Sequence, residues 1–78
     1  MASREQNERK FRNWIALPGG GRRYWLTVKG RARGSARYVK EVDAAETTIR
    51  FAQEIFDDLG TLIESHVKFP VDEGHRRV

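Results

Sequence analysis

The fold depends on residues 44–69, which read AAETTIRFAQEIFDDLGTLIESHVKF. Within this stretch, residues 44–59 fit a helix and a strand almost equally well. A helix would have Asp43 as its N-cap and Glu46 as the capping-box partner, and Gly60 would follow its last residue. Its apolar side chains, spaced alternately by four and three residues, would form one stripe that covers a face of a thin sheet. This interpretation predicts an α+β fold.

As a strand, the same residues place apolar side chains on one face with a period of two. The run TTIRF at 47–51 is β-branched and aromatic, which favours the strand. Residues 57–60, DDLG, would then close a hairpin, with Gly60 in the left-handed position of a bulged turn. Residues 63–69 would return as the next strand and end at Pro70. We therefore expect a strand rather than a helix at 44–59.

The alternation continues towards the N-terminus. Residues 10–17 and 23–29 alternate apolar and polar side chains, and the turn PGGG at 18–21 joins them into a predicted hairpin. A basic loop at 30–35 leads to a third strand at 36–43. The expected fold is mainly β: a single small antiparallel sheet of about five sequential strands, arranged as a meander or a partial barrel. Exposed edges on so small a sheet need protection, and pairing with a second copy is one way to provide it.

A chain of 78 residues fits one domain. We expect a flexible charged segment at 1–9, a β-rich domain at 10–70 and a polar tail at 71–78. The expected core consists of the inward-facing apolar residues of the strands. These are Phe11, Ile15, Leu17, Tyr24, Leu26, Val28, Val39, Val42, Ile49, Phe51, Ile55, Ile63, Val67 and Phe69.

The composition excludes several classes of protein. The sequence has no cysteine, so no disulfide or thiolate metal site can stabilise it. Its polar start lacks the apolar stretch of a signal peptide, and no run approaches the roughly 18 apolar residues of a membrane span. We expect a cytoplasmic protein with no membrane contact. We expect no cofactor and no metal site, because no His, Asp or Glu spacing matches a recognised ligand set.

Charge is divided unevenly along the chain. Residues 1–40 hold eleven Arg or Lys and two Glu, a net charge of +9, whereas residues 41–78 hold four Arg or Lys and nine Asp or Glu, a net charge of −5. This asymmetry indicates either an anionic partner for the first half or two halves that neutralise each other across the fold or a dimer.

The predicted hairpin and the loop after it carry arginines among aromatic residues. Cations attract phosphates, and exposed aromatic rings stack on unpaired bases. Alternatively, the two tryptophans are core residues or shield the sheet from water. The candidate nucleic-acid-binding residues are Arg12, Trp14, Arg23, Trp25 and Lys29, expected on one face of the hairpin, and Arg31, Arg33 and Arg37, which extend them through the loop.

A second group of residues has the composition of an acid–base site. Glu64, His66 and Lys68 share one face of a strand by its two-residue period, and Asp72 and His75 follow. Histidine accepts and donates protons near neutral pH, a carboxylate can orient it, and a cation can hold a phosphate. Metal-independent ribonucleases use such residues. The alternative is an ordinary solvated strand face followed by a charged tail.

Residues 37–43 and 53–75 resemble a small bacterial domain family of unknown function, most clearly in the Asp-x-x-Gly turn at 57–60 between alternating strands. The resemblance implies the hairpin interpretation of residues 47–69. The ending Gly74-His75-Arg76 is similar to small toxin-like proteins of bacterial toxin–antitoxin pairs. Neither resemblance implies an activity for named positions here.

Three functional hypotheses follow, and the residues favour a binding module over an enzyme. The first is a module that binds RNA or single-stranded nucleic acid through the arginine-rich hairpin and loop. The second is a protein-interaction or self-assembling domain, in which the oppositely charged halves meet. The third is a metal-independent ribonuclease or toxin-like protein, with His66, His75, Glu64 and Lys68 as candidate catalytic residues.

Overall fold

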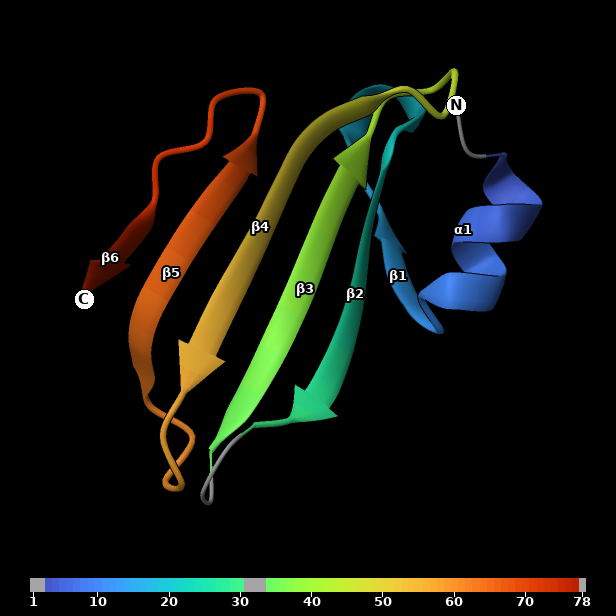
Figure 1. Ribbon diagram of the computed structural model, residues 1–78. Coiled ribbons are helices and arrows are strands. Elements are labelled where there is room, and N and C mark those ends of the chain that lie inside the picture. Colours follow the sequence, from blue (N-terminus) through green and yellow to red (C-terminus); the bar gives the residue numbers. More distant parts are fainter. Residues whose placement is uncertain (1–2, 31–33, 78) are drawn as a thin grey trace.

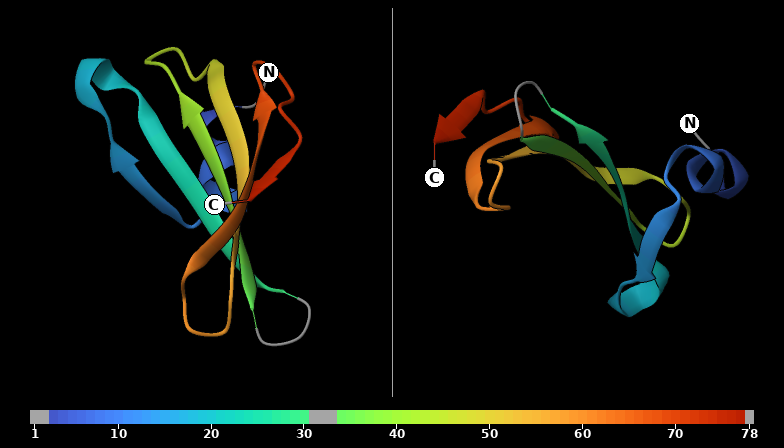
Figure 2. Two further views of the ribbon diagram at one scale, coloured as in Figure 1. Left: turned by 90° about the vertical axis from the view of Figure 1, so that its left-hand side faces the viewer. Right: turned by 90° about the horizontal axis from the view of Figure 1, so that it is seen from below.

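The computed structural model describes residues 3–30 and 34–77 as an open, twisted antiparallel sheet with one α-helix (Figures 1 and 2). Its six strands follow one another in the sheet in sequence order, as a meander predicts. The elements are α1 (Arg4–Lys10), β1 (Asn13–Ala16), the 3-10 turn η1 (Pro18–Gly20), β2 (Arg22–Lys29), β3 (Ser35–Val42), β4 (Thr48–Phe56), β5 (Leu62–Phe69) and β6 (His75–Arg77). The strand expected at 44–59 is confirmed as β4, and the alternative helix is wrong. The helix α1 is too short and polar to cross a membrane, and the described residues form no other α-helix.

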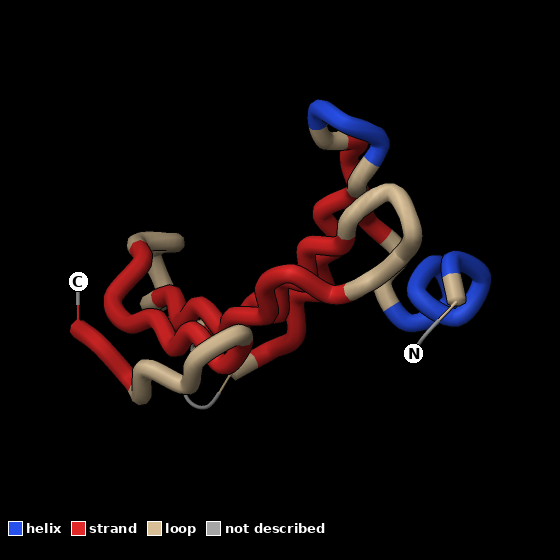
Figure 3. The backbone as a smooth tube through the Cα atoms, turned by 90° about the horizontal axis from the view of Figure 1, so that it is seen from above, coloured by secondary structure: helices blue, strands red, loops and turns tan. Residues whose placement is uncertain are grey.

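Two regular elements lie outside the strands that the sequence predicts. Within the segment expected to be flexible, α1 forms at Arg4–Lys10 with a capping box between Ser3 and Gln6. A helix of this length is marginal alone, so its packing on the sheet must stabilise it. The tail expected at 71–78 contributes a sixth strand, β6, which pairs with β5. Figure 3 shows α1 and β6 at opposite ends of the sheet.

Two connections between strands use the same chemistry. Asp57 accepts hydrogen bonds from the backbone N–H groups two and four residues later, and Gly60 takes the left-handed conformation at φ 82°. Asp43 accepts the same two bonds in the preceding turn. There the left-handed position, with φ 65°, belongs to Glu46. A non-glycine residue in this conformation costs about 1 kcal/mol, so other contacts must hold Glu46 in place.

The sheet has two unlike faces. The helix face is the one on which α1 packs, and the opposite face has no helix over it. Strand alternation and register assign the side chains to the faces. The helix face includes Trp14, Tyr24, Leu26, Tyr38, Lys40, Phe51, Gln53, Glu64, His66 and Lys68, and the opposite face includes Ile15, Arg23, Trp25, Arg37, Val39, Arg50, Ala52 and Glu54.

The main core cluster is small and lies on the helix face under α1, while Val39, as expected, and Ala52 are buried on the opposite face. Phe11, Tyr24 and Val42 are fully buried, and Leu26, Tyr38 and Phe51 pack against them. Five of these six residues were expected in the core, and Tyr38 was not. The core expectation is wrong for Ile15, Val28, Ile49, Ile63 and Phe69, whose exposure ranges from 39% to 47%. They are exposed because α1, the single α-helix of the described residues, covers only part of one face of the sheet.

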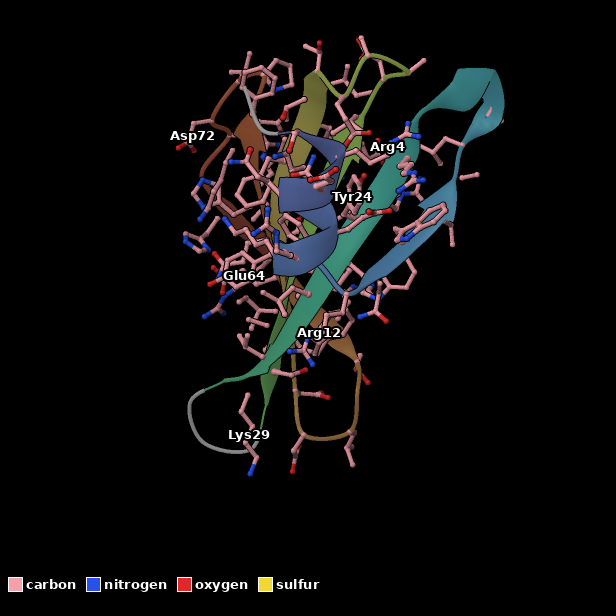
Figure 4. All side chains as sticks on the ribbon, turned by 90° about the vertical axis from the view of Figure 1, so that its right-hand side faces the viewer. Arg4, Arg12, Tyr24, Lys29, Glu64 and Asp72 are labelled. Carbon is pink, nitrogen blue, oxygen red and sulfur yellow. The ribbon has the colours of Figure 1, made fainter. Side chains whose placement is uncertain are left out.

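A buried carboxylate fastens α1 to the sheet. Glu46 accepts hydrogen bonds from Asn7 Nδ2 at 2.8 Å, from the Tyr24 hydroxyl at 2.8 Å and from Arg4 Nε at 3.1 Å. Arg4 and Tyr24 are labelled beside α1 in Figure 4. Lys40 Nζ adds a bond to Asn7 Oδ1 at 2.9 Å. Burial raises the pKa of Glu46, but the three hydrogen bonds outweigh it and leave this pKa below its ordinary value.

Two glycines give a direct test of the sheet. A Cβ on Gly21 would lie 2.3 Å from the carbonyl oxygen of Val42. A Cβ on Gly60 would enter open space, so its cost there comes from the positive φ alone. We expect Gly21→Ala to lower the free energy of unfolding by about 3 kcal/mol and Gly60→Ala by about 1 kcal/mol. Urea unfolding of both variants measures the difference. Equal losses would contradict the close approach of β2 and β3 at Gly21.

Candidate acid–base site

The arginine-rich hairpin does not form the single surface that the sequence predicts. Trp14 pairs with Tyr24 in the register, so it lies on the helix face, where the Arg22 guanidinium stacks on its ring at 3.5 Å. Trp25 lies on the opposite face. The prediction that both tryptophans share one face is therefore wrong. The error comes from the register. Because odd-numbered residues of β1 lie opposite odd-numbered residues of β2, Trp14 and Trp25 point to different faces.

The remaining candidates of that group are spread over the molecule. Arg12 is exposed between α1 and β1, and Lys29 is exposed at the end of β2. Arg23 and Arg37 flank Trp25 on the opposite face. Arg31 and Arg33 lie outside the described residues.

Glutamates neutralise Arg23 and Arg37 on the opposite face. Arg23 Nε lies 2.7 Å from Glu41, and Arg37 Nε lies 2.8 Å from Glu54. A groove of about 410 Å³ runs between these two pairs and includes Trp25. Because Arg23 and Arg37 already have carboxylate partners, the positive charge that they offer a phosphate is reduced, and Arg50 is the arginine of this groove with no ion pair among the described residues.

The other predicted group is brought together. Strand β6 pairs with β5 so that His75 lies opposite His66, and the centroids of the two imidazole rings are 4.5 Å apart. Glu64, His66 and Lys68 share the helix face, as the two-residue period predicts. All four candidate catalytic residues therefore lie in one cluster, together with Asp72 from the β5–β6 connection.

A carboxylate holds each imidazole ring. His75 Nδ1 lies 2.6 Å from Glu64 Oε1, and His66 Nε2 lies 2.5 Å from Asp72 Oδ1. Asp72 also accepts a bond from the Gly74 N–H at 2.9 Å. The bond from His66, followed by the bond from Gly74, lowers the pKa of Asp72, so this carboxylate stays ionised. Both carboxylates are labelled in Figure 4.

The two histidines differ in how much solvent they reach. The His75 side chain is 53% exposed, and the bond to Glu64 leaves its Nε2 free to accept a proton. The His66 side chain is 14% exposed, and its Nδ1 is buried with no hydrogen-bond partner. His75 is therefore the histidine that a dissolved molecule can reach. The less exposed His66 ring packs against it.

Aromatic and polar side chains extend the cluster along the helix face. Lys68 Nζ lies 5.7 Å from the centroid of the Tyr38 ring and 5.9 Å from that of Phe51, which stack on each other. Gln53, directly opposite His66 in the register, donates a bond to the Tyr38 hydroxyl at 3.3 Å. A groove of about 1220 Å³ passes over Tyr38 and Gln53 and reaches His75.

Sequence reasoning missed the parts of this site that come from pairing. Tyr38 and Gln53 carry no motif, and only the β3–β4–β5 register places them beside His66. Arg77 lies opposite Glu64 on β6, a strand that the sequence did not predict. Across residues 3–30 and 34–77, no group of three or more His, Asp or Glu side chains could hold a metal ion.

Comparison with protein families, with curated proteins and with solved structures gave no match. The chemistry of the site therefore has to be argued from its own geometry.

Proposed function

We propose that this protein cleaves single-stranded RNA, with His75 as the base that activates the ribose 2′-hydroxyl. The observation that carries the proposal is the pair of carboxylate-bound histidines beside Lys68. In this arrangement Glu64 fixes the His75 ring through Nδ1 and leaves Nε2 to accept a proton, which is how a carboxylate orients a catalytic histidine in other hydrolases.

The reaction follows from these roles. His75 Nε2 takes the proton of the 2′-hydroxyl, and the 2′ oxygen bonds to the adjacent phosphorus while the bond from phosphorus to the 5′ oxygen breaks. The imidazolium formed on His75 then protonates the departing 5′ oxygen. The products are a 2′,3′-cyclic phosphate and a 5′-hydroxyl. Lys68 supplies positive charge beside the phosphate, and His66, bonded to Asp72, packs against the His75 ring.

The groove supports a single-stranded substrate. Unpaired bases stack on aromatic rings and bond to amides, and the groove contains Tyr38 and Gln53 next to the two histidines. RNA was also the ligand in our first hypothesis from the sequence. The surface is different, because the helix face replaces the arginine-rich hairpin as the place of binding.

A cleavage assay tests the proposal. We expect the protein to cut an end-labelled single-stranded RNA in the presence of EDTA and to leave 2′,3′-cyclic phosphate ends, identified by mass spectrometry. The same oligonucleotide with 2′-O-methyl riboses should remain intact, because it has no 2′-hydroxyl to deprotonate. Cutting of the methylated strand, or intact RNA after prolonged incubation, would contradict the proposal.

A further inference from the structure

Three lysines on the helix face form no direct ion pair among the described residues, although Lys40 interacts with Glu46 and Lys68 with Asp72 at longer range. Lys10, Lys40 and Lys68 take part in none of the ion pairs formed by residues 3–30 and 34–77. In contrast, Arg23 and Arg37 on the opposite face are paired with glutamates. The spare positive charge of the described chain therefore includes a lysine group beside the acid–base site.

Lys40 contacts α1, and Lys10 is the last residue of that helix. Lys40 Nζ donates to Asn7 Oδ1 at 2.9 Å, and Lys10 lies one helical turn beyond Asn7, with its Nζ 5.6 Å from the centroid of the Phe11 ring. Burial, followed by repulsion from Lys10, lowers the pKa of Lys40 below its ordinary value. Two positive charges are thus held close together, and attraction to Glu46, which Asn7 separates from Lys40, offsets their repulsion only in part.

Lys68 continues this group towards the histidines. Lys40 lies opposite Phe51 in the register of β3 and β4, and Lys68 Nζ lies over the Phe51 ring from the other side, on β5. Lys68 is also two residues from His66 on the same face. Lys10, Lys40 and Lys68 therefore form a row that starts at the end of α1 and leads to the acid–base site.

We infer that this lysine row binds successive phosphates of the RNA strand whose bond is cut at His75. An RNA strand that lies along the row would place its phosphates on the lysines. The bases at the end of the strand next to His75 would then enter the groove at Tyr38. The inference rests on the proposed function for the identity of the ligand. It adds a substrate path and two residues, Lys10 and Lys40, that no sequence pattern indicated.

The test measures binding separately from cleavage. A fluorescent 2′-O-methyl RNA, which the protein should not cut, is titrated with the wild type, Lys10→Gln, Lys68→Gln and Arg50→Gln, and binding is followed by fluorescence anisotropy at several salt concentrations. Because Lys10 is exposed, Lys10→Gln changes the charge with little effect on folding. Arg50 is the matched control, since it loses the same charge from the groove on the opposite face.

We expect each lysine variant to weaken binding about fivefold at low salt and to reduce the slope of log affinity against log salt by about 0.7. Arg50→Gln should bind as the wild type does. Wild-type affinity in both lysine variants, or an equal loss in Arg50→Gln, overturns the inference even if RNA is cleaved. Lysine-dependent binding without any cleavage of unmodified RNA supports the phosphate row and removes the proposed reaction.

Discussion

His75→Ala is expected to slow RNA cleavage by about 10²- to 10⁴-fold, the usual contribution of a positioned proton acceptor. The variant removes the exposed imidazole that we propose as the base and leaves the sheet intact. Because the side chain is 53% exposed and lies on a short edge strand, its loss costs little stability. The rate under single-turnover conditions, measured beside an unfolding curve of the same variant, separates lost chemistry from lost folding.

Two further substitutions sharpen this prediction. Glu64→Gln keeps His75 but weakens the charge that orients it, and we expect a loss of about tenfold or more. Arg76→Ala removes a neighbouring side chain on β6 that is 68% exposed and whose one ion pair among the described residues, with Glu73, is long at 3.7 Å. It should cleave RNA at the wild-type rate. If Arg76→Ala and His75→Ala were equally impaired, the effect would belong to β6 as a strand and His75 would have no catalytic role.

Glu46→Ala is expected to lower the free energy of unfolding by about 3 kcal/mol. The substitution leaves the buried Tyr24 hydroxyl and the buried Asn7 amide without their acceptor. It also removes the main polar contact between α1 and the sheet. Chemical unfolding followed by circular dichroism measures the loss. Glu8→Ala, which breaks the more exposed pair with Arg22, is the control and should cost less than 1 kcal/mol.

The backbone at this position adds a second comparison. Glu46 has a φ of 65°, which alanine tolerates poorly and glycine tolerates well. Glu46→Gly should therefore be about 1 kcal/mol more stable than Glu46→Ala, although both lack the carboxylate. If the two variants are equally stable, the left-handed conformation of residue 46 does not store strain.

The pH dependence of stability follows from the same carboxylate. Hydrogen bonds hold the pKa of Glu46 below its ordinary value of 4.5, despite burial. A lowered folded-state pKa means that the stabilisation is present above pH 4.5 and is lost as the pH falls through the folded-state value. In Glu46→Gln, which cannot titrate, this part of the acid sensitivity should disappear.

The sequence predicted the sheet but not its register. Residues 47–51 and the turn at 57–60 were sufficient to identify β4 and β5, because both signals are local. The register of β1 against β2 depends on the geometry of the turn after Leu17, which the glycine run 19–21 leaves open. As a result, the expected faces of β1 were reversed, and Trp14 was placed with Trp25.

The candidate site shows the same limit. Glu64, His66 and Lys68 could be grouped from the period of one strand. Their approach to His75 depends on β6, a strand of three residues whose pairing leaves no hydrophobic pattern in the sequence. The neutralisation of Arg23 and Arg37 depends on contacts between neighbouring strands. Long-range pairing therefore decided which of the two predicted sites was assembled.

The helix α1 was missed because its signal is short and polar. Ser3 and Gln6 do form a capping-box pattern, but no apolar stripe follows it. The turn DAAET at 43–47 could have indicated the position of Glu46, since it shares its first Asp and last Thr with DDLGT at 57–61 and has Glu46 in the place of Gly60.

The most direct test of the account uses a DNA oligonucleotide that contains one ribonucleotide. The wild type is expected to cut it only on the 3′ side of that ribose and to leave a 2′,3′-cyclic phosphate, and the double variant His66→Ala/His75→Ala should leave it whole. Cutting at other positions, or cutting by the double variant at the wild-type rate, would contradict the claim that His75, supported by His66, moves the proton of a ribose hydroxyl.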